Sequence, residues 1–73
     1  MKVIEDITLD DGRRYRIVDD LPADGGYFSV ERADVRNGCT LWRRVSPCFG
    51  DAARAREALE KLAAQTITAT ATI

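Results

Sequence analysis

Apolar and polar positions repeat with a helical period in one segment, residues 51–65 (DAARAREALEKLAAQ). This segment is rich in strong helix formers, contains no proline and opens with Asp51, a favourable N-cap residue. Small alanines precede larger leucines along its apolar side, so the pattern predicts a helix that packs on a flat surface such as a sheet. The apolar stripe consists of Ala52, Ala55, Leu59, Leu62 and Ala63.

A period of two predicts a first hairpin from residues 1–9 and 13–19, joined by the Asp-Asp-Gly turn at 10–12. A three-residue loop with its glycine in the left-handed conformation sets Ile7 opposite Tyr15. A two-residue loop would instead place apolar residues opposite arginines. The first strand alternates except at Ile4 and Glu5, and its apolar face consists of Met1, Val3, Ile7 and Leu9.

A second hairpin is predicted from residues 27–33 and 39–45, after a loop rich in Pro, Gly and Asp. Its turn contains Asn37-Gly38, a strong signal for a type I′ turn. The resulting register sets Val30 opposite Val45 on the inward face.

The same register places Arg32 directly opposite Arg43 and Glu31 opposite Arg44. Opposed like charges are unfavourable in a sheet, whereas a Glu–Arg pair is favourable. We therefore expect the two opposed arginines to lie at the rim of the sheet, or a bulge to shift the register.

The tail, residues 66–73 (TITATATI), alternates isoleucine and alanine with threonine. It is typical of a fifth strand, which would extend the sheet edge or pair with a second copy of the protein. A frayed tail is the alternative. The chain is therefore expected to be a monomer, or a homodimer through this strand.

Together these elements predict an α+β fold: an antiparallel sheet of four to five strands with one α-helix packed on one face. The 73 residues form one domain, with 45% hydrophobic and 32% charged residues and a net charge of −1. A chain of this length buries only about 60% of its unfolded surface, which leaves no room for a deep substrate cleft. No apolar run is long enough to span a membrane, and the N-terminus lacks a signal-peptide pattern, so a cytoplasmic protein is expected.

The residue inventory argues against catalysis and metal binding. The absence of histidine removes the common nucleophile–base pairs and the usual zinc ligands. Cys39 and Cys48, on one extended segment, would lie too far apart for a disulfide and are expected to be reduced. Cys48 precedes the helix, where a reactive thiolate is the alternative. The loop acids lack the spacing of a calcium loop. We expect no enzyme activity, no metal and no cofactor.

Charge is distributed unevenly along the chain. Residues 1–24 carry seven acidic and four basic side chains, and residues 25–73 carry five acidic and seven basic ones. The acidic part predicts a partner-binding site formed by Asp10, Asp11, Asp19, Asp20 and Asp24. The basic part gives an alternative binding face formed by Arg32, Trp42, Arg43 and Arg44, because arginine-flanked aromatics occur at interface hot spots and on nucleic-acid-stacking sheets.

The sequence pI of about 5.3 is far from the basic character usual in nucleic-acid-binding domains. It favours a protein-binding inhibitor, whose carboxylates would stand in for phosphates in a partner's basic groove. A small nucleic-acid-binding regulator is the second hypothesis, and an enzyme ranks last.

In size, in its order of two hairpins and a helix around DDG, NG and DAARAREALEKL, and in the absence of a catalytic motif, the chain resembles the small phage-encoded anti-CRISPR proteins. The resemblance covers the general architecture and assigns no site residue. It implies a partner, a CRISPR effector complex, and an action, the blocking of target DNA recognition.

Overall fold

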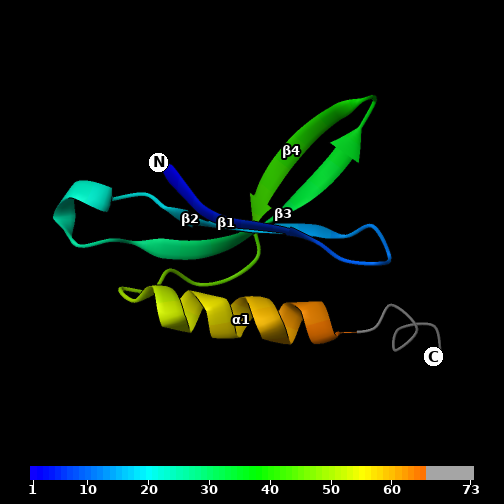
Figure 1. Cartoon of the computed structure of the whole chain (residues 1–73). Helices are drawn as coiled ribbons and strands as arrows, with labels where there is room; N and C mark the ends of the chain where they lie inside the picture. Colours follow the sequence, from blue (N-terminus) through cyan, green and yellow to red (C-terminus); the bar gives the residue numbers. More distant parts are fainter. Residues whose placement is uncertain (66–73) are drawn as a thin grey trace.

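The computed structural model describes residues 1–65, which form a four-stranded antiparallel sheet in the order β1-β2-β3-β4 with one helix on one face (Figure 1). This architecture confirms the α+β prediction. The predicted fifth strand, residues 66–73, lies outside the described residues. The elements are β1 (Lys2–Thr8), β2 (Arg14–Asp19), the 3₁₀ turn η1 (Pro22–Asp24), β3 (Phe28–Arg36), β4 (Cys39–Arg44) and α1 (Ala52–Ala64).

The first hairpin has the predicted register, with Ile7 opposite Tyr15. Its loop is the three-residue form, because the Leu9 N–H donates to the Arg13 carbonyl over 2.7 Å. Gly12 adopts a left-handed φ of 92°, which is the conformation this loop requires.

The interruption of the apolar–polar alternation in the first strand corresponds to a β-bulge at Ile4. Val3 pairs with Val18, but Glu5 pairs with Ile17, so one residue of β1 has no partner. The bulge places Val3 and Ile7 on opposite faces, which corrects the prediction that they share one. Because β1 is an edge strand, the bulge also makes it a poorer template for pairing with another chain.

The second hairpin turns at Asn37 and Gly38, whose φ angles of 53° and 80° are both positive as a type I′ turn requires. The predicted pairing of Val30 with Val45 is present, since the Val45 N–H donates to the Val30 carbonyl over 2.9 Å. β3 continues to Arg36, three residues beyond its predicted end. The outer half of the hairpin rises away from α1 (Figure 1), and Val35 and Arg36 at the end of β3 are exposed.

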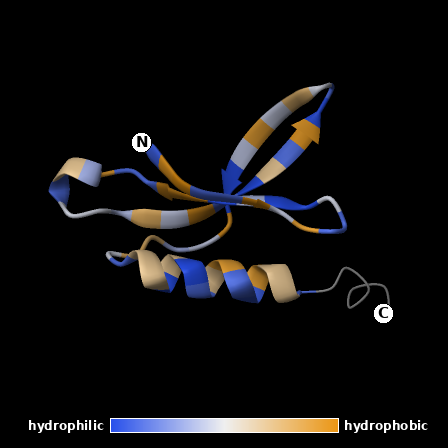
Figure 2. Ribbon diagram, in the orientation of Figure 1, coloured by the Kyte–Doolittle hydropathy of each residue, from blue (hydrophilic) through white to orange (hydrophobic). Residues whose placement is uncertain are grey.

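The core lies between the sheet and α1. Tyr15, Ile17 and Val30 from the sheet pack against Ala55 and Leu59 from the helix, and all five are buried. Figure 2 shows hydrophobic and hydrophilic residues alternating along the strands, as expected where successive side chains point to opposite faces. The sheet face that packs on α1 is therefore set by the tyrosine, isoleucine and valine positions of β2 and β3.

The helix begins as predicted, with the Asp51 carboxylate accepting a hydrogen bond from the Ala53 N–H over 2.7 Å. Such a cap is worth roughly 1 kcal/mol. The apolar stripe is confirmed at Ala55, Leu59 and Leu62, but Ala52 is exposed, and Ala58, which was not predicted, packs against the core edge. Ala52 is exposed because the helix first contacts the sheet at Ala55, about one turn after Ala52.

The other end of the helix is tied to the first hairpin by Arg13. Its guanidinium donates to the carbonyls of Leu62 and Ala63 over 3.3 and 3.4 Å, and it pairs with Asp11 at 2.8 Å. A cation at the helix C-terminus satisfies carbonyls that have no partner within the helix and interacts favourably with the helix dipole. Arg13 therefore joins the turn before β2 to the end of α1.

Candidate functional site

The five acidic residues of the predicted partner-binding site lie at two opposite ends of the sheet (Figure 1). Asp10 and Asp11 lie in the turn between β1 and β2, whereas Asp19, Asp20 and Asp24 lie at the loop between β2 and β3. They therefore form two separate acidic clusters rather than one surface.

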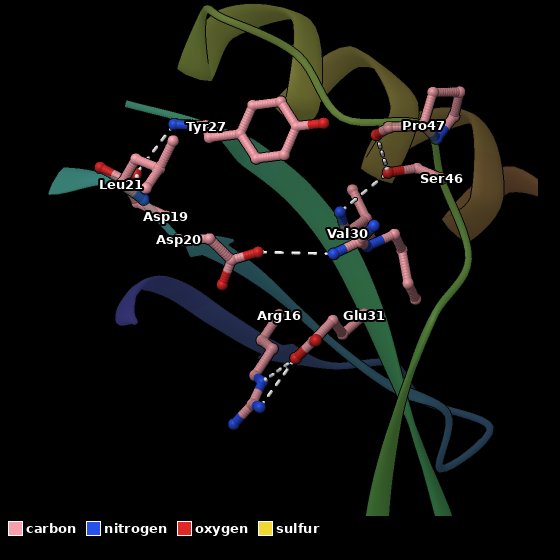
Figure 3. A network of polar contacts seen from close by, with 10 residues as sticks. Arg16, Asp19, Asp20, Leu21, Tyr27, Val30, Glu31, Ser46 and Pro47 are labelled. Atoms are coloured by element: carbon pink, nitrogen blue, oxygen red, sulfur yellow. Dashed lines mark hydrogen bonds and ion pairs between the residues drawn. The ribbon is translucent and has the colours of Figure 1, made fainter. Parts of the chain in front are cut away.

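Asp19 is used inside its own loop. Its side chain is buried, and Oδ1 accepts hydrogen bonds from the N–H groups of Leu21 and Tyr27 over 3.0 and 2.9 Å (Figure 3). A carboxylate that satisfies both ends of a loop holds that loop closed. Asp19 consequently positions the neighbouring acids and does not itself face solvent.

Asp11 is likewise engaged within its turn. It accepts from the Arg13 N–H over 3.0 Å and from Arg13 Nε over 2.8 Å. The Arg13 N–H, supported by the guanidinium, holds the pKa of Asp11 below its usual value, so this carboxylate remains ionised.

The remaining three acids make fewer contacts. Asp20 has one long contact, 3.5 Å to Arg44, while Asp10 and Asp24 are exposed and make no side-chain hydrogen bond or ion pair with other residues of the 1–65 region. Of the five predicted acids, Asp10 and Asp24 are therefore exposed and unpaired within residues 1–65, whereas Asp11 is exposed but paired and Asp20 is half-buried.

The four residues of the alternative binding face are divided between the two faces of the sheet. Tyr15, Ile17 and Val30 pack on α1, so alternation and register place Arg32 and Arg43 on the same side as the helix. The opposite side, here called the open face, carries Arg14, Arg16, Glu31, Trp42 and Arg44. Arg32 and Arg43 therefore cannot flank Trp42.

The arginines that do flank Trp42 come from β2. The guanidinium carbon of Arg16 lies 4.1 Å from the centroid of the Trp42 ring, and that of Arg14 lies 5.2 Å from it. Both distances are within the range of a cation–π interaction. Arg14 and Arg16 were not predicted to lie beside Trp42, although alternation with the inward-facing Tyr15 and Ile17 places both on the outward side of β2.

Each of the two arginines also pairs with a carboxylate. Arg14 binds Asp6 through two hydrogen bonds of 3.0 and 2.7 Å, and Arg16 pairs with Glu31 at 2.7 Å (Figure 3 shows the second pair). The Arg14 side chain holds the pKa of Asp6 below its usual value. We call the charge-balanced group on the open face the Trp42 cluster; it consists of Asp6, Arg14, Arg16, Glu31 and Trp42.

An open hollow of about 270 Å³ lies at the outer half of the β3–β4 hairpin. Three of its five lining side chains are arginines. We call it the arginine pocket; its lining consists of Arg32, Ala33, Asp34, Arg36 and Arg43.

The two cysteines are free, as predicted. Cys39 is exposed beside the β3–β4 turn, and Cys48 is half-buried in the connection to α1. Cys48 lies beside Tyr27, and this contact raises the pKa of the Tyr27 phenol above its usual value.

No three acidic, cysteine or histidine side chains gather as a metal-binding group within residues 1–65. No helix in that part of the chain is long and apolar enough to cross a membrane. Comparison of the chain with protein families, with curated proteins and with solved structures found no match.

Proposed function

We propose that this chain is a small non-catalytic protein-binding inhibitor that contacts its partner through the Trp42 cluster. The observation that carries the proposal is a half-exposed tryptophan stacked by two arginines on the sheet face that α1 leaves free. Tryptophan and arginine are the residue types most enriched at interface hot spots, where an aromatic anchor is surrounded by contacts that exclude water.

The ion pairs of the cluster favour a protein partner over a nucleic acid. Asp6 and Glu31 already neutralise Arg14 and Arg16, at 2.7 Å in each pair. Proteins bind a phosphate backbone mainly through unpaired lysines and arginines, which neutralise phosphates and release their counterions. To bind Arg14 and Arg16, a nucleic acid would therefore first have to displace both carboxylates. A tryptophan held between arginines suits a protein interface, where aromatic residues and arginine are enriched.

The resemblance to anti-CRISPR proteins in size and layout suggests the partner, a CRISPR effector complex in the cytoplasm. The carboxylates of Asp10, Asp20 and Asp24 would occupy a basic groove of that partner and stand in for DNA phosphates. In this proposal the Trp42 cluster supplies most of the binding energy, and the acids supply electrostatic steering and block DNA recognition.

The first experiment is an affinity pull-down of the tagged protein from a bacterial lysate with and without nuclease, read by mass spectrometry. Recovery of the same protein complex in both samples, followed by loss of DNA binding by that complex when the chain is added, is the expected result. If the protein complex is recovered only in the sample without nuclease, the result contradicts the inhibitor proposal and supports the nucleic-acid-binding hypothesis.

Replacing Trp42 with alanine is expected to weaken partner binding about 30-fold or more, the loss that corresponds to a hot-spot residue worth about 2 kcal/mol. The ring provides the surface on which both arginines stack, so its removal leaves them held only by their carboxylate partners. Dissociation constants measured by biolayer interferometry check this result.

Leu41→Ala is the matched control, because Leu41 is the preceding residue of β4, is 55% exposed and points to the other side of the sheet. We expect this variant to bind as the parent chain does. Equal losses for the two variants would contradict the assignment of the interface to the open face.

The proposed role of the acids predicts a kinetic effect. Asp10→Lys combined with Asp24→Lys is expected to slow association about tenfold at low salt, with a difference that shrinks as salt rises, because exposed charges steer encounters over a screened distance. Both side chains are exposed, and neither forms a side-chain hydrogen bond or ion pair within residues 1–65 that the change would break.

Glu57→Lys combined with Glu60→Lys makes the same change in net charge on the exposed side of α1 and serves as the control. If both double variants slow association equally, total charge and not the position of the acidic clusters governs the encounter.

A further inference from the structure

Arg32 and Arg43 form an unusual pair on the helix side of the β3–β4 hairpin. They are direct cross-strand partners and both are exposed, and no bulge separates them, so the alternative of a shifted register is wrong. Like charges in this position repel each other. Among residues 1–65 neither guanidinium forms an ion pair.

The surroundings of the pair form a pocket with an excess of positive charge. The arginine pocket contains one acid, Asp34, and that carboxylate is engaged by Arg36 at 3.1 Å. Two guanidinium groups, those of Arg32 and Arg43, are therefore left without compensation at the edge of one hollow.

One of the two guanidinium groups is partly fixed before any ligand arrives. The Arg32 guanidinium carbon lies 5.9 Å from the centroid of the Tyr15 ring, and Tyr15 is buried in the core. A cation held over an aromatic face loses less side-chain freedom when it binds an anion. The pocket thus combines unneutralised charge, concavity and partial preorganisation.

We propose that the arginine pocket binds a phosphate monoester, with Arg32 and Arg43 as its two ligating residues. A monoester carries about −1.5 to −2 charges near pH 7 and so offsets both guanidinium groups, whereas a carboxylate offsets only one. The planar arginine fork also matches phosphate oxygens in a bidentate arrangement. A nucleic-acid backbone, with one charge per phosphate, requires a longer track of free cations than this pocket presents.

The arginine pocket lies on the opposite side of the sheet from the Trp42 cluster, and phosphate binding goes beyond the proposed inhibitor function. An experiment can therefore contradict one of the two proposals and leave the other intact. The monoester could come from a free phosphate compound or from a phosphorylated side chain of a protein. Both sources present the same chemical group to the pocket.

The test is calorimetric titration of the full chain with inorganic phosphate, with a phosphoserine peptide, with the same peptide unphosphorylated, and with a ten-residue oligothymidylate. Saturable binding of inorganic phosphate or of the phosphopeptide is expected, and the tighter of the two identifies the source. Absence of binding by both, or binding of the oligonucleotide as tight as that of the monoesters, would overturn the proposal.

Arg32→Gln combined with Arg43→Gln is expected to weaken phosphate binding at least tenfold. This variant removes a repulsive pair and should remain folded, which its circular dichroism and thermal midpoint will show. Arg54→Gln combined with Lys61→Gln removes the same charge from exposed positions of α1 and should leave binding unchanged. An equal loss in both variants would show that total charge, not the pocket, attracts the anion and would overturn the proposal.

Discussion

Replacing Leu59 with alanine is expected to unfold a large fraction of the protein at 25 °C. Leu59 is 3% exposed and packs from α1 into the cluster that contains Tyr15, Ile17 and Val30. Truncating a buried leucine costs roughly 2 to 5 kcal/mol, since the lost burial is accompanied by a cavity that the surroundings fill only partly. A single core of this size supplies about 3 to 5 kcal/mol of stability. Urea titration followed by circular dichroism measures the loss.

Leu41→Ala provides the control for this variant, because the same atoms are removed from a side chain that is 55% exposed. We expect its free energy of unfolding to remain within about 0.5 kcal/mol of the parent value. If the two leucine variants are equally stable, the packing of α1 on the sheet does not hold the fold together.

The hairpins were predictable from the sequence because turn residues and strand parity act locally. Gly12 and the pair Asn37-Gly38 fix the loop conformations, and each loop then determines which residues face one another. The bulge at Ile4 was visible as a break in alternation, but its effect on Val3 was not deduced. A single unpaired residue reverses the face of everything before it.

The composition of the candidate site was less predictable, because it depends on which strands of the two hairpins are neighbours. Pairing of β2 with β3 brings Arg14 and Arg16 across the open face to Trp42, and no local signal specifies that pairing. By contrast, Arg43 is next to Trp42 in the sequence, but strand alternation places its side chain on the helix side of the sheet.

Asp19 shows a different limit of sequence reasoning. As one of several acids in a loop it was interpreted as a binding residue, yet its carboxylate accepts two backbone hydrogen bonds and is buried. The signal was present, since an aspartate two residues before Leu21 at a strand end is typical of a side-chain-to-backbone turn. Acids at loop entrances should therefore first be considered as structural groups.

The loop that Asp19 closes depends equally on a glycine, and Gly26→Ala is expected to cost roughly 2 to 4 kcal/mol of stability. Gly26 has a φ of +102°, a conformation that strains a residue with a side chain by about 1 to 3 kcal/mol. An added Cβ would also overlap the Phe28 ring, lying 2.5 Å from Cζ. The Phe28 backbone cannot move freely, because its N–H and carbonyl pair with Phe49 over 2.7 Å.

Gly25→Ala separates the two causes. Gly25 has a similar φ of +85°, but an added Cβ there meets no atom within 4 Å. It should therefore show the backbone strain alone, and the further loss in the Gly26 variant, about 1 to 3 kcal/mol, measures the displacement of the Phe28 ring from the core edge. Urea midpoints give both values, and the Phe28 ring resonances in NMR spectra should shift only in the Gly26 variant. Equal destabilisation with unshifted resonances would mean that the ring does not pack against this glycine.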